Sequence, residues 1–406
     1  MKLLKNQSIR GLLPLAAALA CLGAQAQSAE SAFSFSGFAS VGLTGSNNDD
    51  GQYVIPGQIR GADKSWSGEV DSKLGLQVTG RLNSMFSGTV QLLTKQGGEG
   101  NFRPEIEWAF VKAQVLPSLA LRAGRMGGPF FAVSDFRDVG YANTWVRPPI
   151  DVYGQVPVSH FDGADALYQT NVGSATLSAQ VFGGASKAHF ERTELKLKSI
   201  AGFNATAELD GGITLRLGHA QGKLTVYNAS LDQLVAGLRS VPLPAVASVG
   251  DQLDAHGKDV SFTGIGAGID RGDWLANFEF TKRRTKTYVP DTTGWYATVG
   301  YRYGKFTPYL TLSQIKVDDS NVNNTIPAAS QQLAVLKATV DGTVASQHTA
   351  QKTTALGLRW DAYRNVAVKA QFDHVRPEGL GLFNRTKPGF DPGSVNVYSL
   401  VVDLVF

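Results

Sequence analysis

The sequence predicts an all-β protein, a transmembrane antiparallel β-barrel of about 16 strands. Three observations lead to this prediction. Segments in which apolar and polar residues alternate with a period of two recur from Phe33 to Phe406. Long and short connections take turns between these segments. The chain also contains 45 Gly, 21 Phe and 12 Tyr in 406 residues, a composition that suits twisted strands joined by turns.

The chain opens with the features of a secretory signal peptide. Basic residues come first, then an apolar run, then a small-residue cleavage site: Lys2, Lys5 and Arg10, GLLPLAAALACLGA, and Ala24-Gln25-Ala26. We expect cleavage after Ala26, which leaves residues 27–406 as one barrel domain. Acylation at Cys21, as in a lipoprotein, is the alternative, but Ala18 stands where a branched apolar residue is usual. In either case the protein is exported.

The bulk properties of the exported chain exclude several classes of protein. Loss of residues 1–26 lowers the formal net charge from +4 to +1, which gives no sign of a nucleic-acid partner. The only cysteine leaves with the leader, so hydrogen-bonded ladders and packing must hold the fold without disulfides. Beyond the leader, no apolar run approaches the roughly 18 residues that a membrane helix needs. Any crossing of a membrane must therefore be made by strands.

The strands have one apolar face and one polar face. In the last strand the apolar face is Tyr398, Leu400, Val402, Leu404 and Phe406, and the other face is Val397, Ser399, Val401 and Asp403. In GWYATVGYRYG the apolar face is Trp295, Ala297, Val299, Tyr301 and Tyr303. A soluble sandwich also alternates, but aromatic residues at both ends of the apolar face and the rhythm of loop lengths favour a membrane barrel.

The connections between strands fall into two groups. Short turns with Gly, Asn, Asp or Pro are expected at 81–84, 116–118, 171–173, 210–212, 270–273, 303–306 and 361–365. Longer loops are expected at 45–67, 96–104, 126–160, 184–193, 224–257, 287–293, 317–350 and 377–394. In membrane barrels the short turns face the periplasm and the longer loops face outward. The spacing of leucines also predicts a helix over 230–241.

The third long loop, 126–160, is too aromatic to lie free in water. Its apolar residues include Phe130, Phe131, Phe136, Tyr141, Trp145, Val146 and Tyr153. The inside of a wide barrel is the surface on which such a loop can pack. We therefore expect the loop to fold inward, where it would narrow the lumen.

With these features the chain resembles the Gram-negative general porin family. The resemblance rests on the leader, the strand count, the long third loop, LRAGR running into that loop, and the terminal phenylalanine. It implies a homotrimer in the bacterial outer membrane, in contact with its lipid, and an eyelet where acids of the third loop face a basic wall. Carried over, Asp135 and Asp138 are the eyelet acids, Asp151 is a further candidate, and Phe406 is the signal for the outer-membrane barrel assembly machinery. Arg137, Arg147 and the double proline depart from the family's usual loop.

The interior faces of the strands supply candidates for the basic wall. They are Lys73, Arg81, Arg122, Arg216, Arg302, Arg359 and Lys369. A charge facing lipid near the midplane would cost about 2 to 4 kcal/mol, so the alternation assigns these residues to the water-filled lumen. Arg81 lies beside a periplasmic turn, whereas Arg122 and Arg359 are more central. For each of these residues, the alternative to a role in the eyelet is that of an ordinary solvated charge in the lumen.

These residues predict passive diffusion of small hydrophilic solutes and ions through a narrow waist. Acids on one side and basic groups on the other would set a transverse field. One alternative is a substrate-specific channel for a sugar or an organic acid, in which Trp145 and Tyr153 form a sliding surface. Another is an adhesin or structural barrel that binds through the loops at 224–257 and 317–350.

The sequence does not predict an enzyme, a metal site or a cofactor. It contains no Gly-x-Ser-x-Gly, His-Glu-x-x-His or Walker motif. Asp373 and His374 are adjacent in a strand, so their side chains point to opposite faces. His160 and Asp162 lack a third ligand for a metal.

Overall fold

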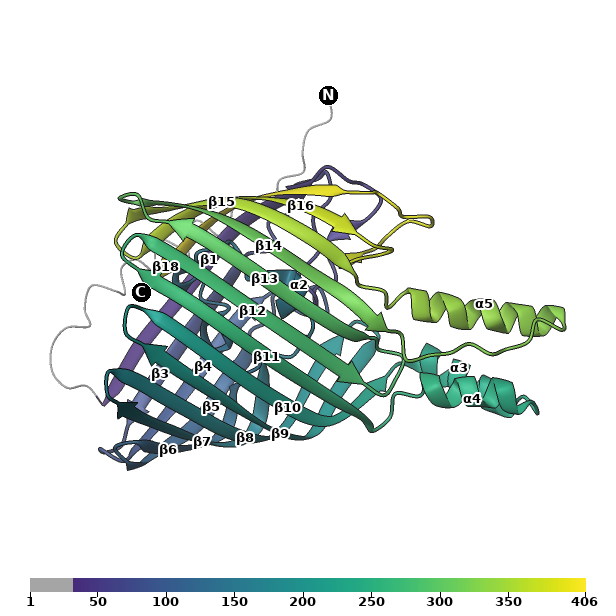
Figure 1. Cartoon of the computed structure of the whole chain (residues 1–406), viewed down its shortest axis with the longest axis horizontal. Helices are drawn as coiled ribbons and strands as arrows, with labels where there is room; N and C mark the ends of the chain where they lie inside the picture. Colours follow the sequence, from purple (N-terminus) through teal and green to yellow (C-terminus); the bar gives the residue numbers. More distant parts are fainter. Residues whose placement is uncertain (1–31) are drawn as a thin grey trace.

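The computed structural model describes residues 32–406, in which sixteen antiparallel strands close into a barrel (Figure 1). The barrel strands are β1 (Phe33–Ser46), β3 (Lys73–Arg81), β4 (Phe86–Lys95), β5 (Glu105–Leu116), β6 (Leu119–Gly127), β7 (His160–Val172), β8 (Ala175–Phe190), β9 (Thr193–Leu209), β10 (Ile213–Tyr227), β11 (Lys258–Arg271), β12 (Trp274–Thr285), β13 (Asp291–Tyr301), β14 (Phe306–Asp319), β15 (Gln351–Tyr363), β16 (Val366–Pro377) and β18 (Val395–Val405). The predicted fold class and strand number are confirmed. The predicted signal peptide lies outside the described residues.

The first and last strands close the ring. β18 runs antiparallel to β1, with Val402 opposite Val41. The end of the chain is held there, because Phe406 and Gly37 exchange two backbone hydrogen bonds of 2.7 and 3.0 Å. The two faces of the last strand lie as the alternation predicts: Leu400 is 49% exposed on the outer face, and Asp403 is fully buried inside.

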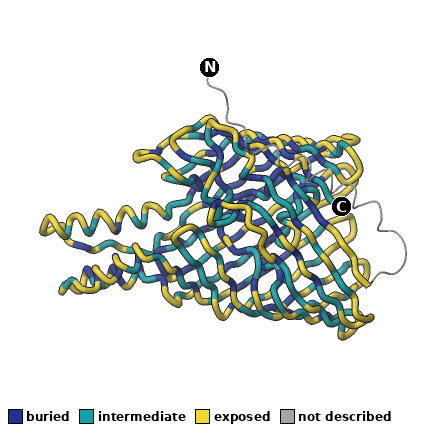
Figure 2. Tube along the Cα trace, turned by 180° about the vertical axis from the view of Figure 1, so that it is seen from behind, coloured by how far each residue is buried: buried dark blue, intermediate teal, exposed yellow. Residues whose placement is uncertain are grey.

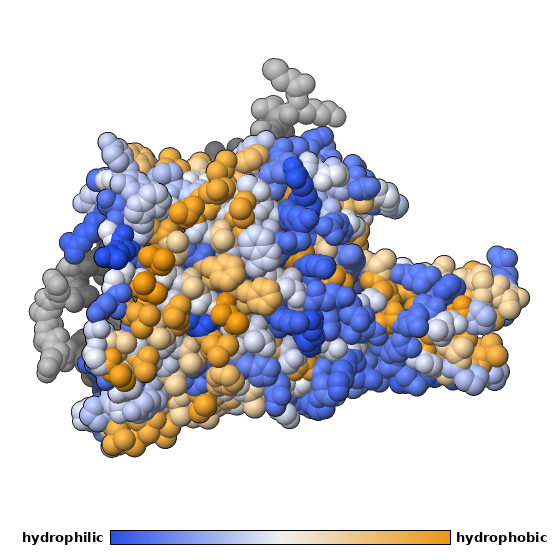
Figure 3. All heavy atoms as spheres, in the orientation of Figure 1, coloured by the Kyte–Doolittle hydropathy of each residue, from blue (hydrophilic) through white to orange (hydrophobic). Residues whose placement is uncertain are grey.

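The two faces of the other strands differ in the same way. On β13, Val299 and Tyr301 are 42% and 37% exposed, whereas Tyr296 and Thr298 face the interior and are 1% and 3% exposed. Figure 2 shows buried and exposed residues alternating along the strands. In Figure 3 apolar side chains gather on the part of the barrel wall away from the long helices. This outer surface suits contact with the hydrocarbon of a membrane.

Aromatic residues border the apolar wall next to the short turns. Trp274 packs edge-on against Tyr301 with ring centroids 4.9 Å apart, and Phe306 stacks on Trp360 at 6.1 Å. Aromatic rings of this kind favour the interface between hydrocarbon and water. They form the periplasmic aromatic girdle that the strand pattern predicts.

The short turns lie where the sequence predicts them, with one clear difference among the long loops. Instead of a loop over 184–193, β8 and β9 continue until only residues 191 and 192 remain between them. Glu194 lies in this extension and forms ion pairs with Lys187 at 3.0 Å and Lys196 at 2.6 Å. Opposite charges on the paired strands thus accompany the ladder where a loop was expected.

Three helices project from the external end of the barrel (Figure 1). They are α3 (Ala229–Ser240), α4 (Pro244–Leu253) and α5 (Gln331–Ala345). The helix predicted over 230–241 is confirmed as α3, and the other two were not predicted. Their buried side chains form one cluster that includes Leu238, Val249 and Val340. We call these helices and the segments that join them the external arm.

Two other long loops fold over the external mouth. A short sheet pairs β2 (Gln52–Tyr53) with β17 (Phe383–Asn384), and its aromatic side chains belong to a cluster with Ile150, Ile315 and Val375. The first and last external loops thus cover part of the third loop from outside. Among the described residues, no helix is long and apolar enough to cross a membrane.

Candidate functional site

The third external loop, residues 128–159, connects β6 to β7 and lies inside the barrel. It contains η1 (Ser134–Phe136), η2 (Gly140–Ala142) and α2 (Ile150–Tyr153), each of one turn or less. Its buried side chains Phe130, Phe131, Trp145, Val152 and Tyr153 share a cluster with Phe182, Phe262 and Tyr296 of the barrel wall. The prediction that this loop folds inward is confirmed. In this position the apolar side chains of the loop pack against the barrel wall, whereas in a free loop they would be exposed to water.

Trp145 and Tyr153 anchor the loop to the wall. The Trp145 ring packs edge-on against Tyr296 at 5.6 Å, and its indole N–H donates to Thr298 at 2.9 Å. The Tyr153 ring stacks on Phe131 at 4.5 Å. The two residues are only 4% and 8% exposed, so neither offers a free ring face to a passing solute.

Three of the seven candidate basic residues bind backbone carbonyls of the loop. The bonds are Arg216 to Pro129 and Phe130 (2.6 and 3.3 Å), Arg359 to Tyr141 and Asn143 (2.7 and 3.0 Å), and Lys369 to Gly140 and Trp145 (2.6 and 2.8 Å). Each of these bases also has an acid within ion-pair distance: Glu279 at 3.9 Å, Asp361 at 2.8 Å and Asp403 at 2.9 Å, in the same order. The predicted wall therefore holds the loop and is largely charge-compensated.

Three more of the candidate bases have different partners. Lys73 lies 3.6 Å from Asp138 of the loop. Arg122 binds Asp165 of the neighbouring strand β7, with its Nε 3.0 Å from a carboxylate oxygen. Arg302 lies near the periplasmic end and binds Asp270 at 2.6 Å. Only the first of these three contacts the loop.

Asp138 is surrounded by cations. Lys95 lies 2.9 Å from its carboxylate, Lys73 lies 3.6 Å away and Arg137 lies 3.7 Å away. Burial acts to raise the pKa of Asp138, but the cations outweigh it and hold that pKa well below its usual range. Asp138 therefore stays ionised and ties the loop to β3 and β4.

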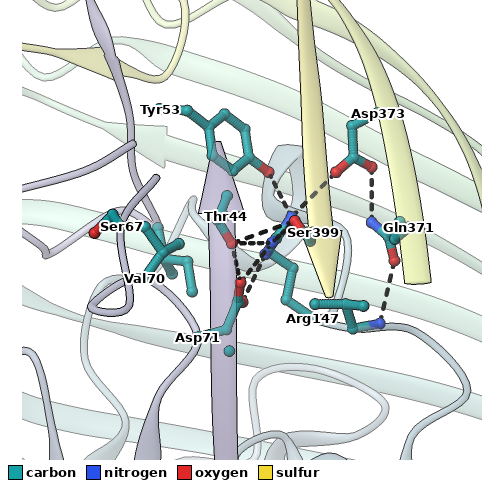
Figure 4. A network of polar contacts seen from close by, with 12 residues as sticks. Thr44, Tyr53, Ser67, Val70, Asp71, Arg147, Gln371, Asp373 and Ser399 are labelled. Carbon is teal, nitrogen blue, oxygen red and sulfur yellow. Dashed lines mark hydrogen bonds and ion pairs between the residues drawn. The ribbon is translucent and has the colours of Figure 1, made fainter. Parts of the chain in front are cut away.

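Arg147 lies at the centre of a buried polar network (Figure 4). Its guanidinium binds both carboxylate oxygens of Asp71, at 2.8 and 2.7 Å, and one oxygen of Asp373 at 3.1 Å. It also donates to Ser399 at 2.5 Å and to the hydroxyl of Tyr53 at 3.3 Å. One side chain thus joins the third loop to the first loop, β16 and β18.

The charges in this network stabilise one another. Burial acts to lower the pKa of Arg147, but the charge of Asp71 outweighs it and holds that pKa well above its ordinary value. For Asp71 the effects are reversed: burial acts to raise its pKa, and Arg147 lowers it below the ordinary value. Both groups are therefore charged in the folded protein.

Asp151 lies behind the loop rather than on the main cavity. It is 1% exposed and accepts a hydrogen bond from the hydroxyl of Ser313 on the wall. With Arg147 and Asp373 it lines a separate cavity of about 20 Å³, which has room for a water molecule. Burial raises the pKa of Asp151 more than its hydrogen bonds lower it.

Asp135 lines the main cavity, a space of about 660 Å³ between the loop and the walls of β9 to β15. The walls contribute both signs of charge, from Glu208, Arg216, Asp270, Arg302, Arg359 and Asp361. The Asp135 carboxylate has no hydrogen bond or ion pair among residues 32–406. Partial burial raises its pKa, although the charges of Arg122 and Arg216 act to lower it. Of the three candidate acids, only Asp135 faces this cavity.

A family model described as Gram-negative porin matches residues 16–387. The chain belongs to the Gram-negative porin family. This porin is therefore a channel of the bacterial outer membrane. A search of curated proteins finds no match to it.

Solved structures of other outer-membrane proteins share the fold of this porin. The trimer form of OmpT from Vibrio cholerae has a TM-score of 0.53 and 13% identity, with 92% of this porin and 99% of that chain covered. The anion-selective porin of Comamonas acidovorans has a TM-score of 0.52 and 13% identity, with 92% of this porin and 99% of that chain covered. OmpF of Salmonella typhi, solved with daunomycin, has a TM-score of 0.53 and 12% identity, with 92% of this porin and 97% of that chain covered.

The sequence analysis missed the residues that lock the loop of this porin in place. Arg147 was noted only as a departure from the family pattern, and its partner Asp71 was not singled out. Asp373 was considered together with His374, which faces outward and contacts Asn396 at 2.7 Å. The sequence contained one signal for this network, since Arg147 lies between apolar residues and a double proline in a loop that is expected to fold inward. A buried arginine requires carboxylates, and alternation offers Asp373 as an interior one.

Proposed function

We propose that this porin is a general diffusion channel, without enzymatic activity, whose conducting path passes Asp135. The observation that carries the proposal is that Asp135 is the one candidate acid on the main cavity, and that its carboxylate is unpaired among the described residues. The other acids of the loop are used in fixing it. An ionised carboxylate at a narrow waist attracts cations and repels anions.

The proposed selectivity is weak. Most basic groups around the cavity have an acid nearby, as Arg302 has Asp270 and Arg359 has Asp361. Their fields largely cancel at a distance, whereas the charge of Asp135 is not compensated by a bonded partner. We therefore expect a modest preference for cations.

Planar-bilayer recording under a KCl gradient tests this role. Asp135→Asn should shift the reversal potential toward anions, because it removes the uncompensated charge and keeps the shape. Asp151→Asn is the matched control, since that carboxylate lies behind the loop, and it should leave the reversal potential unchanged. An unchanged reversal potential in Asp135→Asn would remove that residue from the conducting path.

A solute-specific channel is the second candidate. The main cavity, at about 660 Å³, falls within the size range of small-molecule sites, and Arg359 lies over the ring of Tyr141 at 5.0 Å. Liposome swelling with sugars and organic acids of equal size separates the candidates. Similar rates support general diffusion, and a marked preference for one class supports a specific channel.

The assembly of the protein is part of the proposal. By analogy with a structural neighbour described as a trimer, the porin is proposed to be a homotrimer. Its terminal Phe406 is proposed as the residue that the barrel assembly machinery recognises. Cross-linking of the native protein tests the first point, and the yield of folded Phe406→Ala in cells tests the second.

A further inference from the structure

The interior wall formed by β9 to β12 carries polar side chains that the protein itself leaves unpaired. All five of them line the main cavity: Asn204, Thr206 and Glu208 on β9, Thr214 on β10 and Asn277 on β12. None of these side chains takes part in a hydrogen bond or an ion pair within residues 32–406. We call these five residues the polar rim. We propose that the polar rim binds a small neutral polyol, such as a monosaccharide, on its way through the cavity.

The strand register brings part of the polar rim into one row across four neighbouring strands (Figure 1). Glu208 lies opposite Thr214, and Thr214 in turn lies opposite Gly268 of β11. On its other side Gly268 lies opposite Asn277. Adjacent strands are about 4.8 Å apart, so roughly 10 Å separate the backbones of Thr214 and Asn277. This spacing suits a ring whose hydroxyl groups reach a polar side chain on each side.

Glycine forms the floor between these side chains. The interior face of β11 presents Gly264, Gly266 and Gly268 at alternate positions. The third loop covers the first two, because an added Cβ would lie 3.4 Å from the Phe130 carbonyl oxygen and 3.8 Å from Cβ of Ala132, respectively. The three atoms nearest to a Cβ on Gly268 all belong to β10 and β12. The floor is therefore open to the cavity at Gly268, where a solute can approach the backbone closely.

The groups around this open floor match the hydrogen-bonding capacity of hydroxyl groups. A hydroxyl both donates and accepts, and so does the amide of Asn277, whereas the carboxylate of Glu208 only accepts. On the loop side the cavity is lined by Phe136, which is 40% exposed. A polyol would thus meet hydrogen-bonding groups on the wall and an apolar ring on the loop. Small-molecule sites commonly combine an apolar surface with a few polar groups in this way.

The polar rim favours a neutral solute over a charged one. Four of its five side chains are amides or hydroxyls, and only Glu208 is ionisable. The basic groups on the same cavity already have acids, as Arg302 has Asp270 and Arg359 has Asp361. An anion would therefore find no free basic group on this wall. A simple cation would use the carboxylate and leave the four neutral side chains unpaired.

The inference rests on the proposed channel function, because it names a solute class that the conducting path retains. Its test measures binding rather than conduction, so the two proposals can fail separately. Saturation-transfer NMR of the folded, full-length porin gives the Kd of D-glucose in a detergent without a sugar headgroup. Triethylene glycol dimethyl ether has nearly the same mass and no hydroxyl group, so it is the comparison solute. The wild type should bind glucose in preference to the ether.

Two matched double variants locate the site. T214V/N277A removes a hydroxyl and an amide from the polar rim. N171A/T176V removes the same two groups from the turn between β7 and β8, where Thr176 donates to Asn171 at 3.0 Å. One neutral hydrogen bond changes an equilibrium constant about fivefold, so the rim variant should bind glucose about 25-fold more weakly. The turn variant should bind it as the wild type does.

Three results would overturn the proposal: equal glucose binding by the rim and turn variants, equal binding of glucose and the ether by the wild type, or no glucose binding at all. Heat-modifiable migration on gels establishes that each variant is folded. If T214V/N277A does not fold, G268A replaces it, since its methyl group fills the open floor and should also weaken glucose binding. An unchanged reversal potential in Asp135→Asn, together with loss of glucose binding in the rim variant, would refute the proposed role of Asp135 and leave the polyol site standing.

Discussion

The charged residues inside the barrel divide into those that hold the third loop and those that are free to act on solutes. Arg147 and Asp138 are bound by opposite charges on several strands or loops. Asp135 lines the main cavity instead. A bound charge contributes chiefly to the position of the loop, and an unbound one contributes chiefly to the field in the channel. The two groups should therefore respond differently to mutation.

Replacing Arg147 should destabilise the porin severely. Arg147→Met would leave Asp71 and Asp373 buried without their cation, and a broken buried pair costs about 3 to 5 kcal/mol. Urea unfolding of the porin refolded into lipid vesicles measures this loss of free energy. Arg364→Met, in an exposed periplasmic turn, is the control and should change the free energy by less than about 0.5 kcal/mol. A loss in Arg147→Met no larger than in the control would show that the network does not stabilise the loop.

The ion preference should depend on pH through Asp135. Its pKa is raised above the ordinary 3.8, so on acidification it binds a proton before an ordinary aspartate does. The neutral form is the one favoured by folding, so this protonation stabilises the folded state and also removes the negative charge from the cavity. As the bath is acidified toward pH 3.8, the reversal potential should shift toward anions. Asp135→Asn should lack this shift, and Asp151→Asn should retain it.

The polar network around Arg147 could not be predicted from local sequence. Its partners Asp71, Asp373 and Ser399 are 76, 226 and 252 positions away. Alternation placed Asp373 and Ser399 on interior faces, but it does not tell which interior groups meet. That depends on how far the loop crosses the lumen, which its packing against the wall determines.

The strands were predictable because each strand faces lipid on one side and water on the other. Period-two alternation identified the sixteen barrel strands and most of their connections, since lipid and water select opposite residue types on the two faces. The external arm lies in water on all sides, so its helices had weaker signals. Only α3 had enough leucines on one face to be predicted, whereas α5 buries a single residue fully, Val340. The sheet of β2 and β17 has two residues in each strand, too few for any pattern.

The third loop approaches the wall so closely that one glycine is required. A Cβ on Gly140 would lie 2.0 Å from Oδ1 of Asp403 and 2.7 Å from Oγ of Ser40, and both of these side chains are buried. Gly140→Ala should therefore push η2 off β1 and β18 and weaken the bond from Lys369 to the carbonyl of residue 140. We expect noisier conductance and a lower free energy of unfolding.

Gly237→Ala is the matched control for this change. Gly237 lies within α3 with nothing within 4 Å of the added methyl group. Alanine is favoured over glycine in a helix by about 1 kcal/mol, so this variant should be as stable as the wild type or slightly more so. Single-channel recording and urea unfolding of both variants check the pair. Quiet channels in Gly140→Ala would show that the contact is not needed to hold the loop.

Of the packed regions of the molecule, one lies inside the barrel around the third loop and another lies in the external arm. The cluster around the third loop contains Phe131 and Tyr296, and that of the arm contains Leu238 and Val249. Within the described chain no fully buried residue belongs to both clusters, and the half-buried Leu197 of β9 packs against each of them. Conduction and any binding by the arm should therefore be separable, which bears on whether the protein acts as a channel or as an adhesin.

Removing the arm should leave the channel intact. Short Gly/Ser linkers in place of 229–253 and 323–346 would delete all three helices but keep the bond from the Val226 N–H to the Ala255 carbonyl, which joins the ends of the first gap at 2.9 Å. Loop length adds little to the cost of closure, so β10 and β11 should still pair. We expect wild-type conductance and heat-modifiable migration from the trimmed protein. If the trimmed protein folds but does not conduct, the arm belongs to the conducting path. If it conducts as the wild type does, binding through the arm is not needed for the channel, and an adhesin role would be an addition to diffusion rather than a replacement for it.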